Sequence, residues 1–315
     1  MKTESILVIK LGALGDFVQA LGPCAAIRAH HRTARIVLLT TAPLVALAEQ
    51  APYFDDIWVD DRPRPAEVHR WLGLRRRLRS RSFTRVYDLQ TNGRSSAYFR
   101  LFWPGPRPEW SGIARGASHP HVNPRRNAMH TLDRQAEQLR LAGIDIVPPP
   151  DLSWLKGDIG GLGIAARFVL LAPGGSAHRP GKRWPAASYA ALAQTLAARD
   201  LQPVLIGTAA EADVLEEIRR RCPAAVSLAG RTSLAELVVL ARHAVAAVGN
   251  DTGPMHLAAA AGCPMLVLFS RESNPAQCAP RGPAVRILRR EALTELGVEE
   301  VLEAFDSVLA AAAGA

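Results

Sequence analysis

Short apolar segments alternate with amphipathic segments along most of the chain, and this alternation constrains the fold more than any other feature. Segments such as SILVIK (5–10) and FVLLA (168–172) have the length and composition of buried strands, and helix-like segments follow them. The pattern predicts parallel sheets with helices on both faces. Three consecutive prolines at 148–150 resist both helix and central strand, so we expect one domain at 1–150 and another at 151–315.

The same periodicity predicts the individual elements. In the first half it predicts strands and helices at 5–10, about 16–29, 35–40, 56–60, 65–80, 85–90 and about 130–142. The stretch at 100–127, rich in Arg, Trp and Pro, breaks the pattern. In the second half we expect strands at 168–172, 203–207, 225–230, 244–250 and 264–270, with helices between them. No strand follows the final helix, about 293–312, and we expect this helix to pack back on the first domain.

The charge of the chain is unevenly distributed. The sequence has 38 Lys and Arg against 29 Asp and Glu, a net charge of +9. Residues 1–150 hold 22 of the cations and 13 of the anions, whereas residues 151–315 hold 16 of each. The excess favours a polyanionic partner for the first half, with a merely solvated surface as the alternative. No recognition motif accompanies the basic run at 75–85, so we expect no nucleic acid, and the helix at about 65–82 suits an anionic lipid surface or a phosphorylated glycan.

Other features point to a cytoplasmic protein. No run of about 18 uncharged apolar residues occurs, and the first residues lack the features of a signal peptide. The cysteines are too few and too scattered for a disulfide framework, and they lack metal-ligand spacing. We therefore expect neither disulfides nor a metal site at Cys24, Cys222, Cys263 and Cys278.

Three junctions between a strand and a helix carry the residues with chemical potential. The first is KLGALGD at 10–16, where glycines allow a ligand to approach the backbone. Asp16 near the start of the helix has two interpretations, an N-cap that satisfies free amides or a general base that faces a substrate. The spacing is not that of a dinucleotide-binding loop, which requires GxGxxG.

The second and third junctions favour phosphate binding. In PGGSAHRPGKRWP (173–185), glycines, a hydroxyl and cations follow a strand, but the spacing differs from a Walker A loop and Arg183 replaces its Ser or Thr. In GNDTGPMHLAAAAG (249–262), the free amides of a helix start at Thr252 and Gly253 would face an anion. Asp251 can cap that helix or bind sugar hydroxyls, and His256 can equally be a packed core residue.

The three segments together resemble glycosyltransferase family 9, the lipopolysaccharide core heptosyltransferases. They read ILVIKLGALGDFVQALGPCAAIR (6–28), LAPGGSAHRPGKRWPAASYAALAQTL (171–196) and VGNDTGPMHLAAAAGCPMLVLF (248–269). The resemblance implies a GT-B fold, an α/β architecture with two Rossmann-like doubly wound parallel-sheet domains facing across a cleft. It makes 1–150 the acceptor-binding domain and 151–315 the donor-binding domain. The stretch at about 62–127 carries no signature of the family.

The resemblance also implies an activity and a set of site residues. It implies an inverting, metal-independent transfer of heptose from ADP-heptose to a lipopolysaccharide inner-core acceptor, lipid A–Kdo or heptosyl-Kdo. No cofactor is implied, and the enzyme would work peripherally at the inner face of the cytoplasmic membrane. Asp16 would be the general base, and Lys182 would neutralise the donor pyrophosphate. The other implied residues are Ser176, Asp251, Thr252, Gly253 and His256 for the donor, and Gly15 and Lys10 for the acceptor.

Two alternatives stay open at this point. One is another enzyme of the same architecture that uses a different nucleotide sugar, such as an epimerase or a transferase of another sugar. The other is a non-catalytic protein that binds a nucleotide sugar, although the presence of both Asp16 and Lys182 argues against it.

Overall fold

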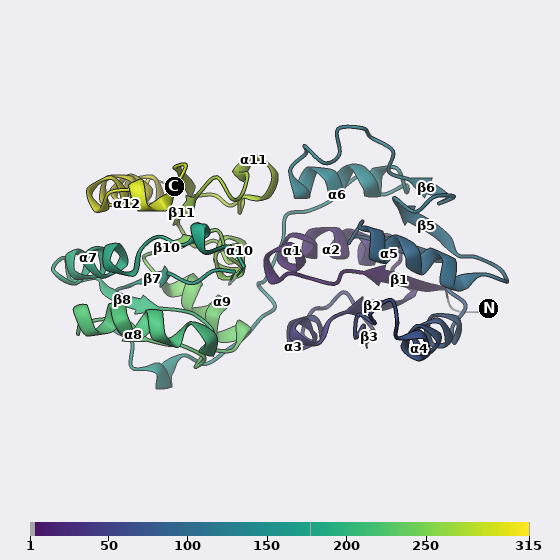
Figure 1. Ribbon diagram of the computed structural model, residues 1–315, viewed down its shortest axis with the longest axis horizontal. Helices are drawn as coiled ribbons and strands as arrows, with labels where there is room; N and C mark the ends of the chain where they lie inside the picture. The colour runs from purple at the N-terminus through teal and green to yellow at the C-terminus, as the bar shows by residue number, and fades with distance from the viewer. Residues whose placement is uncertain (1–3, 177, 315) are drawn as a thin grey trace. The chain divides into compact units, whose positions relative to one another are not determined.

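The computed structural model describes residues 4–176 and 178–314 (Figure 1). The chain forms two compact units, one within residues 1–150 and the other within residues 151–315. Each unit is built on one six-stranded sheet in which all neighbouring strands run parallel, with helices on both faces. The predicted α/β class with two parallel sheets is confirmed.

Both sheets have the same strand order. The first runs β3-β2-β1-β4-β5-β6, from Asp56–Val59, Arg35–Thr40, Ser5–Ile9, Arg85–Asp88, Glu109–Gly112 and His119–Pro120. The second runs β12-β11-β10-β7-β8-β9, from Val285–Arg289, Met265–Phe269, Ala246–Asn250, Phe168–Ala172, Gln202–Leu205 and Val226–Ser227. In each, the direction of the strand order reverses at the centre, between β1 and β4 and between β7 and β10. Ligands of such sheets bind beyond the carboxyl ends of the strands at this reversal.

Helices cover the two faces of each sheet. In the first unit these are α1 to α6, at Leu14–Gln19, Leu21–His30, Val45–Ala48, Val68–Arg79, Gly93–Tyr98 and Thr131–Arg140. In the second they are α7 to α12, at Ala186–Ala197, Ala212–Arg221, Leu234–His243, Gly253–Ala260, Pro275–Cys278 and Val298–Ala313. Alternate strand residues face opposite sides, so Leu7 and Ile9 share a core with Leu74 and Leu78 of α4.

The sequence patterns missed some elements and misplaced others. The irregular stretch at 100–127 contains β5 and β6, short strands without an apolar run, although Trp110 of β5 is fully buried. Strand β12 and helix α5 were not predicted either. The expected helix at 16–29 is divided between α1 and α2. Because proline fits only the first turn of a helix, the restart at Leu21 places Pro23 where its missing amide costs no hydrogen bond.

The final helix belongs to the second unit, and the expectation that it also packs back on the first stays a prediction. Helix α12 contacts α7 and the strands β10, β11 and β12. Its apolar stripe, Val301, Ala304, Phe305 and Val308, is buried in the same core as Val169 and Leu171 of β7. This stripe of α12 is therefore covered within the second unit.

Candidate functional site

In the second unit, two predicted donor-site residues meet at the reversal of the sheet. Lys182 lies in the loop that follows β7, and Asp251 follows β10 directly. The Lys182 Nζ donates a hydrogen bond to Asp251 Oδ2 over 2.6 Å, and the two side chains are only 12% and 7% exposed. A buried ammonium at the carboxyl ends of central strands is well placed to meet a phosphate, with Asp251 as its partner in the absence of ligand.

A residue that no sequence motif marked holds both ends of the loop after β7. Asn250, the last residue of β10, is fully buried. Its Oδ1 accepts hydrogen bonds from the Trp184 amide and the Tyr189 hydroxyl, both at 3.1 Å. Its Nδ2 donates to the carbonyls of Pro173 and Gly174 at 2.8 and 3.0 Å. Asn250 thus fixes both ends of the loop that carries Lys182; a polar residue ending a buried strand was the available signal.

Glu211 fastens the same loop from the other side. Its Oε1 accepts the Gly175 amide at 2.8 Å, and its Oε2 accepts the amide and hydroxyl of Thr208 at 2.8 and 2.9 Å. A side chain at Gly174 would clash with this carboxylate, since a Cβ there would lie 1.9 Å from Oε1. No local pattern marks the contact of Glu211 with Gly175, because it joins loops that follow two different strands.

The first turn of α10 lies beside this pair. Thr252 is its N-cap residue but makes no side-chain cap bond, and its Oγ1 is buried without a hydrogen-bond partner. The amides at a helix start are available to an anion, and the helix dipole favours one there. His256, one turn further, is buried with Nε2 3.9 Å from Asp251 Oδ1. Ser176 lies exposed on the loop after β7.

The first unit places Lys10, Gly15 and Asp16 at the end of β1. Lys10 is buried, and its Nζ donates to the Leu89 carbonyl at 3.2 Å. Burial lowers the pKa of Lys10, and Asp16 is the largest of the charges that oppose this effect. Gly15 is buried within α1. The turn between them needs the glycine at position 12, whose φ is +108°.

The position of Asp16 fits both the helix-start interpretation and the base interpretation. It is the third residue of α1 rather than its N-cap, and its Oδ2 accepts the Ala13 amide at 3.3 Å. The carboxylate therefore helps to satisfy the helix start. It is also exposed, as a base that removes a proton from an external hydroxyl must be.

Two arginines of the first unit were not predicted: Arg134, which interacts with Asp16, and Arg126, which interacts with Arg134 and Asp88. Arg134 lies on α6. Arg126 lies in the segment before α6, at the end of the stretch 100–127 that breaks the strand–helix pattern. Burial lowers the pKa of both guanidinium groups, and Asp16 opposes this for Arg134. The Nε and Nη2 atoms of Arg126 are buried without a hydrogen-bond partner. These two atoms form the edge that binds a carboxylate or phosphate in a bidentate manner.

Asp88, at the end of β4, is buried and interacts electrostatically with Lys10 and Arg126. Its Oδ1 accepts the amides of Gln90 and Thr91 at 3.1 and 2.9 Å, and its Oδ2 accepts the Ser95 hydroxyl at 2.9 Å. Burial raises its pKa from 3.8 to about 6, and these hydrogen bonds and Lys10 limit the rise. Asp88 therefore holds the turn that leads from β4 into α5.

Replacing Asp88 by Asn should change how stability depends on pH. Between about pH 4 and 6 the folded chain keeps a proton on Asp88 that the unfolded chain releases. The contribution of this group to the free energy of unfolding therefore falls as pH rises through that window, by about 3 kcal/mol in total. Asn keeps the acceptor for the two amides and does not titrate. In urea unfolding at pH 4, 5, 6 and 7, the free energy of unfolding of the variant should rise relative to that of the parent as pH increases. A constant difference between the two proteins across this range would contradict the raised pKa of Asp88.

Clusters of metal ligands and membrane-spanning helices are both absent from the part of the chain that the structure describes. Within residues 4–176 and 178–314, no group of three or more His, Cys, Asp or Glu side chains is arranged to hold a metal ion. Among the same residues, every helix is too short or too polar to cross a bilayer.

Comparison with known proteins relates this geometry to a family. The sequence model of glycosyltransferase family 9 (heptosyltransferase) matches residues 71–303. Lipooligosaccharide heptosyltransferase 2 of Haemophilus influenzae is 38% identical over 120 residues, which cover 36% of this chain and 34% of that protein. The chain therefore matches about a third of the length of this curated relative.

Two solved structures from Escherichia coli share the fold. ADP-heptose lps heptosyltransferase II has a TM-score of 0.79 at 24% identity, and the match covers 97% of this chain and 98% of that chain. Heptosyltransferase WaaC with ADP has a TM-score of 0.76 at 17% identity, over 96% of this chain and 99% of that chain. The predicted GT-B fold class is confirmed by these matches.

Proposed function

The chain belongs to glycosyltransferase family 9, and from this premise we propose that it is an inverting heptosyltransferase of lipopolysaccharide core synthesis. The donor is ADP-heptose, and the acceptor is an inner-core glycan, lipid A–Kdo or heptosyl-Kdo. The observation that carries the proposal is the buried Lys182–Asp251 pair beside the first turn of α10. It supplies a cation, free amides and a carboxylate within one small region, which is what a sugar linked to a pyrophosphate requires.

On the donor side, binding of the pyrophosphate redirects Lys182 from Asp251 to a phosphate oxygen. The first-turn amides of α10, Thr252 Oγ1 and Ser176 complete the phosphate site, with Gly253 allowing close approach. Asp251, released from Lys182, accepts hydrogen bonds from sugar hydroxyls, and His256 supports its carboxylate. In this proposal residues 151–315 form the donor-binding domain. The transfer uses no metal.

The chemical step is a single displacement. The acceptor hydroxyl oxygen attacks the anomeric carbon of the heptose while the bond from that carbon to the phosphate oxygen breaks. Asp16 takes the hydroxyl proton, and ADP leaves with the electron pair of the broken bond. The charge that develops on the leaving phosphate is stabilised by Lys182 and the α10 amides. The attack from the opposite side inverts the anomeric configuration.

On the acceptor side, residues 1–150 bind the anionic glycan. Arg126 offers an unpartnered guanidinium edge, and Arg134 lies near Asp16, so an acidic group of the acceptor can bind close to the base. Lys10 and Gly15 shape the floor of this site. The enzyme works from the cytoplasm at the inner face of the membrane that carries its lipid-linked acceptor, with no nucleic acid as partner.

The test is a transfer assay with matched donors. The purified chain is incubated with Kdo-containing lipid A and ADP-heptose, UDP-glucose or GDP-mannose, with and without EDTA, and products are identified by mass spectrometry. Of the three donors, we expect only ADP-heptose to support transfer, and we expect EDTA to leave the rate unchanged. Transfer from UDP- or GDP-sugars would favour the enzyme of different donor specificity. Tight ADP binding without transfer to any acceptor would favour the non-catalytic protein.

A further inference from the structure

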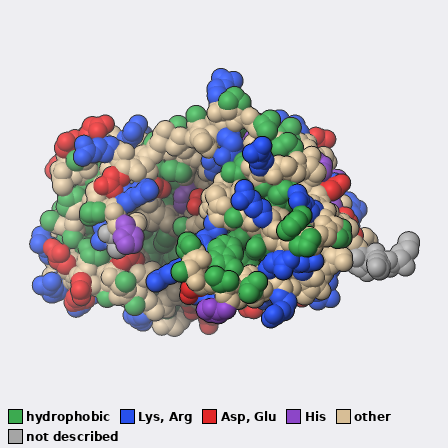
Figure 2. Space-filling view, turned by 45° about the vertical axis from the view of Figure 1, so that its right-hand side comes forward, with side chains coloured by type: hydrophobic (Ala, Val, Ile, Leu, Met, Phe, Trp, Pro, Cys, Tyr) green, Lys and Arg blue, Asp and Glu red, His purple; other side chains and the backbone are tan. Residues whose placement is uncertain are grey.

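One surface of the first unit is strongly cationic. Residues 68–108 contain ten arginines and a single acidic residue, Asp88, which is buried. Helix α4 contributes an outward stripe at positions 68, 72, 75, 76 and 79, spaced by three or four residues. In Figure 2 Lys and Arg side chains are interspersed with hydrophobic ones over the half of the view that comes forward. The basic stripe plays no part in the site around Asp16.

Apolar side chains are exposed among these cations. Val68 and Leu72 on the stripe are 62% and 52% exposed, and Trp103 on the turn after α5 is 62% exposed. The turn is fastened to α4, because Arg75 Nη2 donates to the Trp103 carbonyl at 3.0 Å and Arg79 Nη2 donates to the Pro104 carbonyl at 2.9 Å. The helix stripe and the turn therefore form one surface, which we call the α4 surface.

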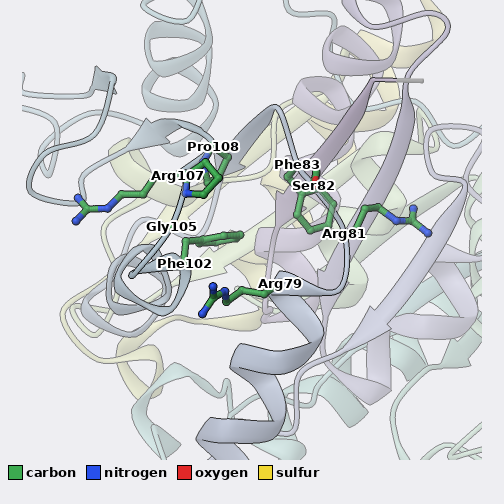
Figure 3. A pocket seen from close by; sticks show the side chains of 9 residues that line it. Arg79, Arg81, Ser82, Phe83, Phe102, Gly105, Arg107 and Pro108 are labelled. Carbon is green, nitrogen blue, oxygen red and sulfur yellow. The ribbon is translucent and has the colours of Figure 1, made fainter. Parts of the chain in front are cut away.

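A pocket of about 210 Å³ lies at the edge of the α4 surface (Figure 3). Phe83 and Phe102 line it, and arginines from three positions in the chain surround it. Arg81 is already paired with Asp56 at 2.8 Å, and the hydrogen bond from Arg35, with a smaller effect of the one from Arg81, lowers the pKa of Asp56 to about 2. Arg107 is exposed with its guanidinium 5.3 Å from the Phe99 ring. An anionic headgroup could therefore approach Arg79 and Arg107, whereas Arg81 is neutralised.

We propose that the α4 surface binds an anionic lipid bilayer. Exposed cations around a tryptophan and aliphatic side chains are the combination that holds proteins in the headgroup region, where the cations meet lipid phosphates and the apolar groups enter the acyl boundary. Nucleic acid would need aromatic side chains arranged along a groove for bases, and only Trp103 is a large exposed aromatic here. This inference rests on the proposed function, which supplies a lipid-linked acceptor.

The position of the surface fits such an acceptor. Helix α4 follows β3 and precedes β4, so it runs from the carboxyl edge of the sheet toward the amino edge. Its 12 residues span roughly 18 Å. The carboxyl edge, with Asp16, is thus near the start of the helix. The sugars of a membrane-anchored acceptor would extend along this flank to reach the base.

Vesicle binding by the full chain tests the proposal. The first variant, Arg76→Gln with Arg107→Gln, removes two exposed cations, and the second, Leu72→Ser with Trp103→Ser, removes the apolar groups. The control for the first variant, Arg220→Gln with Arg286→Gln, makes the same charge change at exposed positions of the second unit. Sedimentation uses phosphatidylcholine vesicles with and without 30% phosphatidylglycerol, in 50 and 500 mM salt.

The parent should bind only the anionic vesicles, and more weakly at high salt. Each lost arginine should weaken binding about five-fold, and the pair roughly 30-fold, while the control stays at the parental level. Equal binding by the first variant and the control would overturn the proposal. Vesicle binding that does not depend on salt would also overturn it. Competition by millimolar inorganic phosphate, or by single-stranded DNA at low concentration, would overturn it too, because it would identify a soluble ligand.

Transfer assays separate this inference from the proposed function. Both variants should retain parental rates with a delipidated, water-soluble acceptor and lose rate with the acceptor embedded in vesicles. Equal loss with both acceptors would show that the surface acts on the site itself and would overturn the docking role. Vesicle binding without transfer from any donor would leave the α4 surface supported and reject the proposed function.

Discussion

Replacing Asp16 by Asn should lower kcat for heptose transfer by roughly 10²–10⁴-fold and leave the affinity for ADP nearly unchanged. Asn has the size of Asp and keeps an oxygen that can accept the Ala13 amide, so the start of α1 should remain intact. It cannot take a proton from the acceptor hydroxyl. The loss should therefore appear in the chemical step, measured by single-turnover transfer, whereas calorimetry with ADP should match the parent.

The control for this variant is Asp145→Asn, which removes the same charge from an exposed position of the first unit. It should keep parental kcat and the same melting temperature. Full transfer activity in Asp16→Asn would exclude Asp16 as the base. A joint fall of kcat, ADP affinity and melting temperature would instead identify Asp16 as a structural capping residue.

Replacing Lys182 by Ala should weaken ADP binding by roughly 10- to 150-fold, the range expected when a hydrogen bond to a charged group is lost. The change also leaves Asp251 buried without the ammonium that it contacts at 2.6 Å. That carboxylate would repel the phosphates and destabilise the fold. Calorimetry with ADP and thermal unfolding without ligand measure the two consequences separately.

A second substitution distinguishes the two effects. In the double variant Lys182→Ala with Asp251→Asn, the unpaired charge is gone, so stability should recover while ADP affinity stays low. Lys156→Ala, which removes an exposed lysine of the same unit, should bind ADP like the parent. Parental ADP affinity in Lys182→Ala would remove this residue from the donor site and leave the pair as a structural ion pair.

The sequence indicated both sheets because burial imposes a local signature. A central parallel strand is covered on both faces, so β1 and β7 are continuous apolar runs, and both were placed within a residue of their ends. The edge strand β12 is partly exposed and mixes Arg with aliphatic residues, so it lacked this signature. Strand β5 has four residues without an apolar run, although Trp110, Ser111 and Gly112 are all buried.

The same reasoning reached part of the site. Loops that follow parallel strands are where ligands bind, and therefore Lys182 and Asp251 could be singled out from their place after a strand. Their contact, across 69 residues of chain, could not be. Arg126 escaped notice because it sits in an irregular segment, where neither periodicity nor a motif marks a side chain whose guanidinium edge is buried and unpartnered.

By itself the sequence determined the two α/β units, the proline-rich boundary between them, the basic first half and the strand-to-helix junctions that carry reactive side chains. These follow from the order of apolar, polar and special residues along neighbouring positions. Only the tertiary structure decided that Asn250 and Glu211 hold the loop that carries Lys182, that α12 completes the second core, and that Arg126 lies within the electrostatic reach of Asp88 and Arg134. The physical reason is that hydrogen bonds and burial depend on which distant segments the sheet order brings together, and no local pattern encodes that.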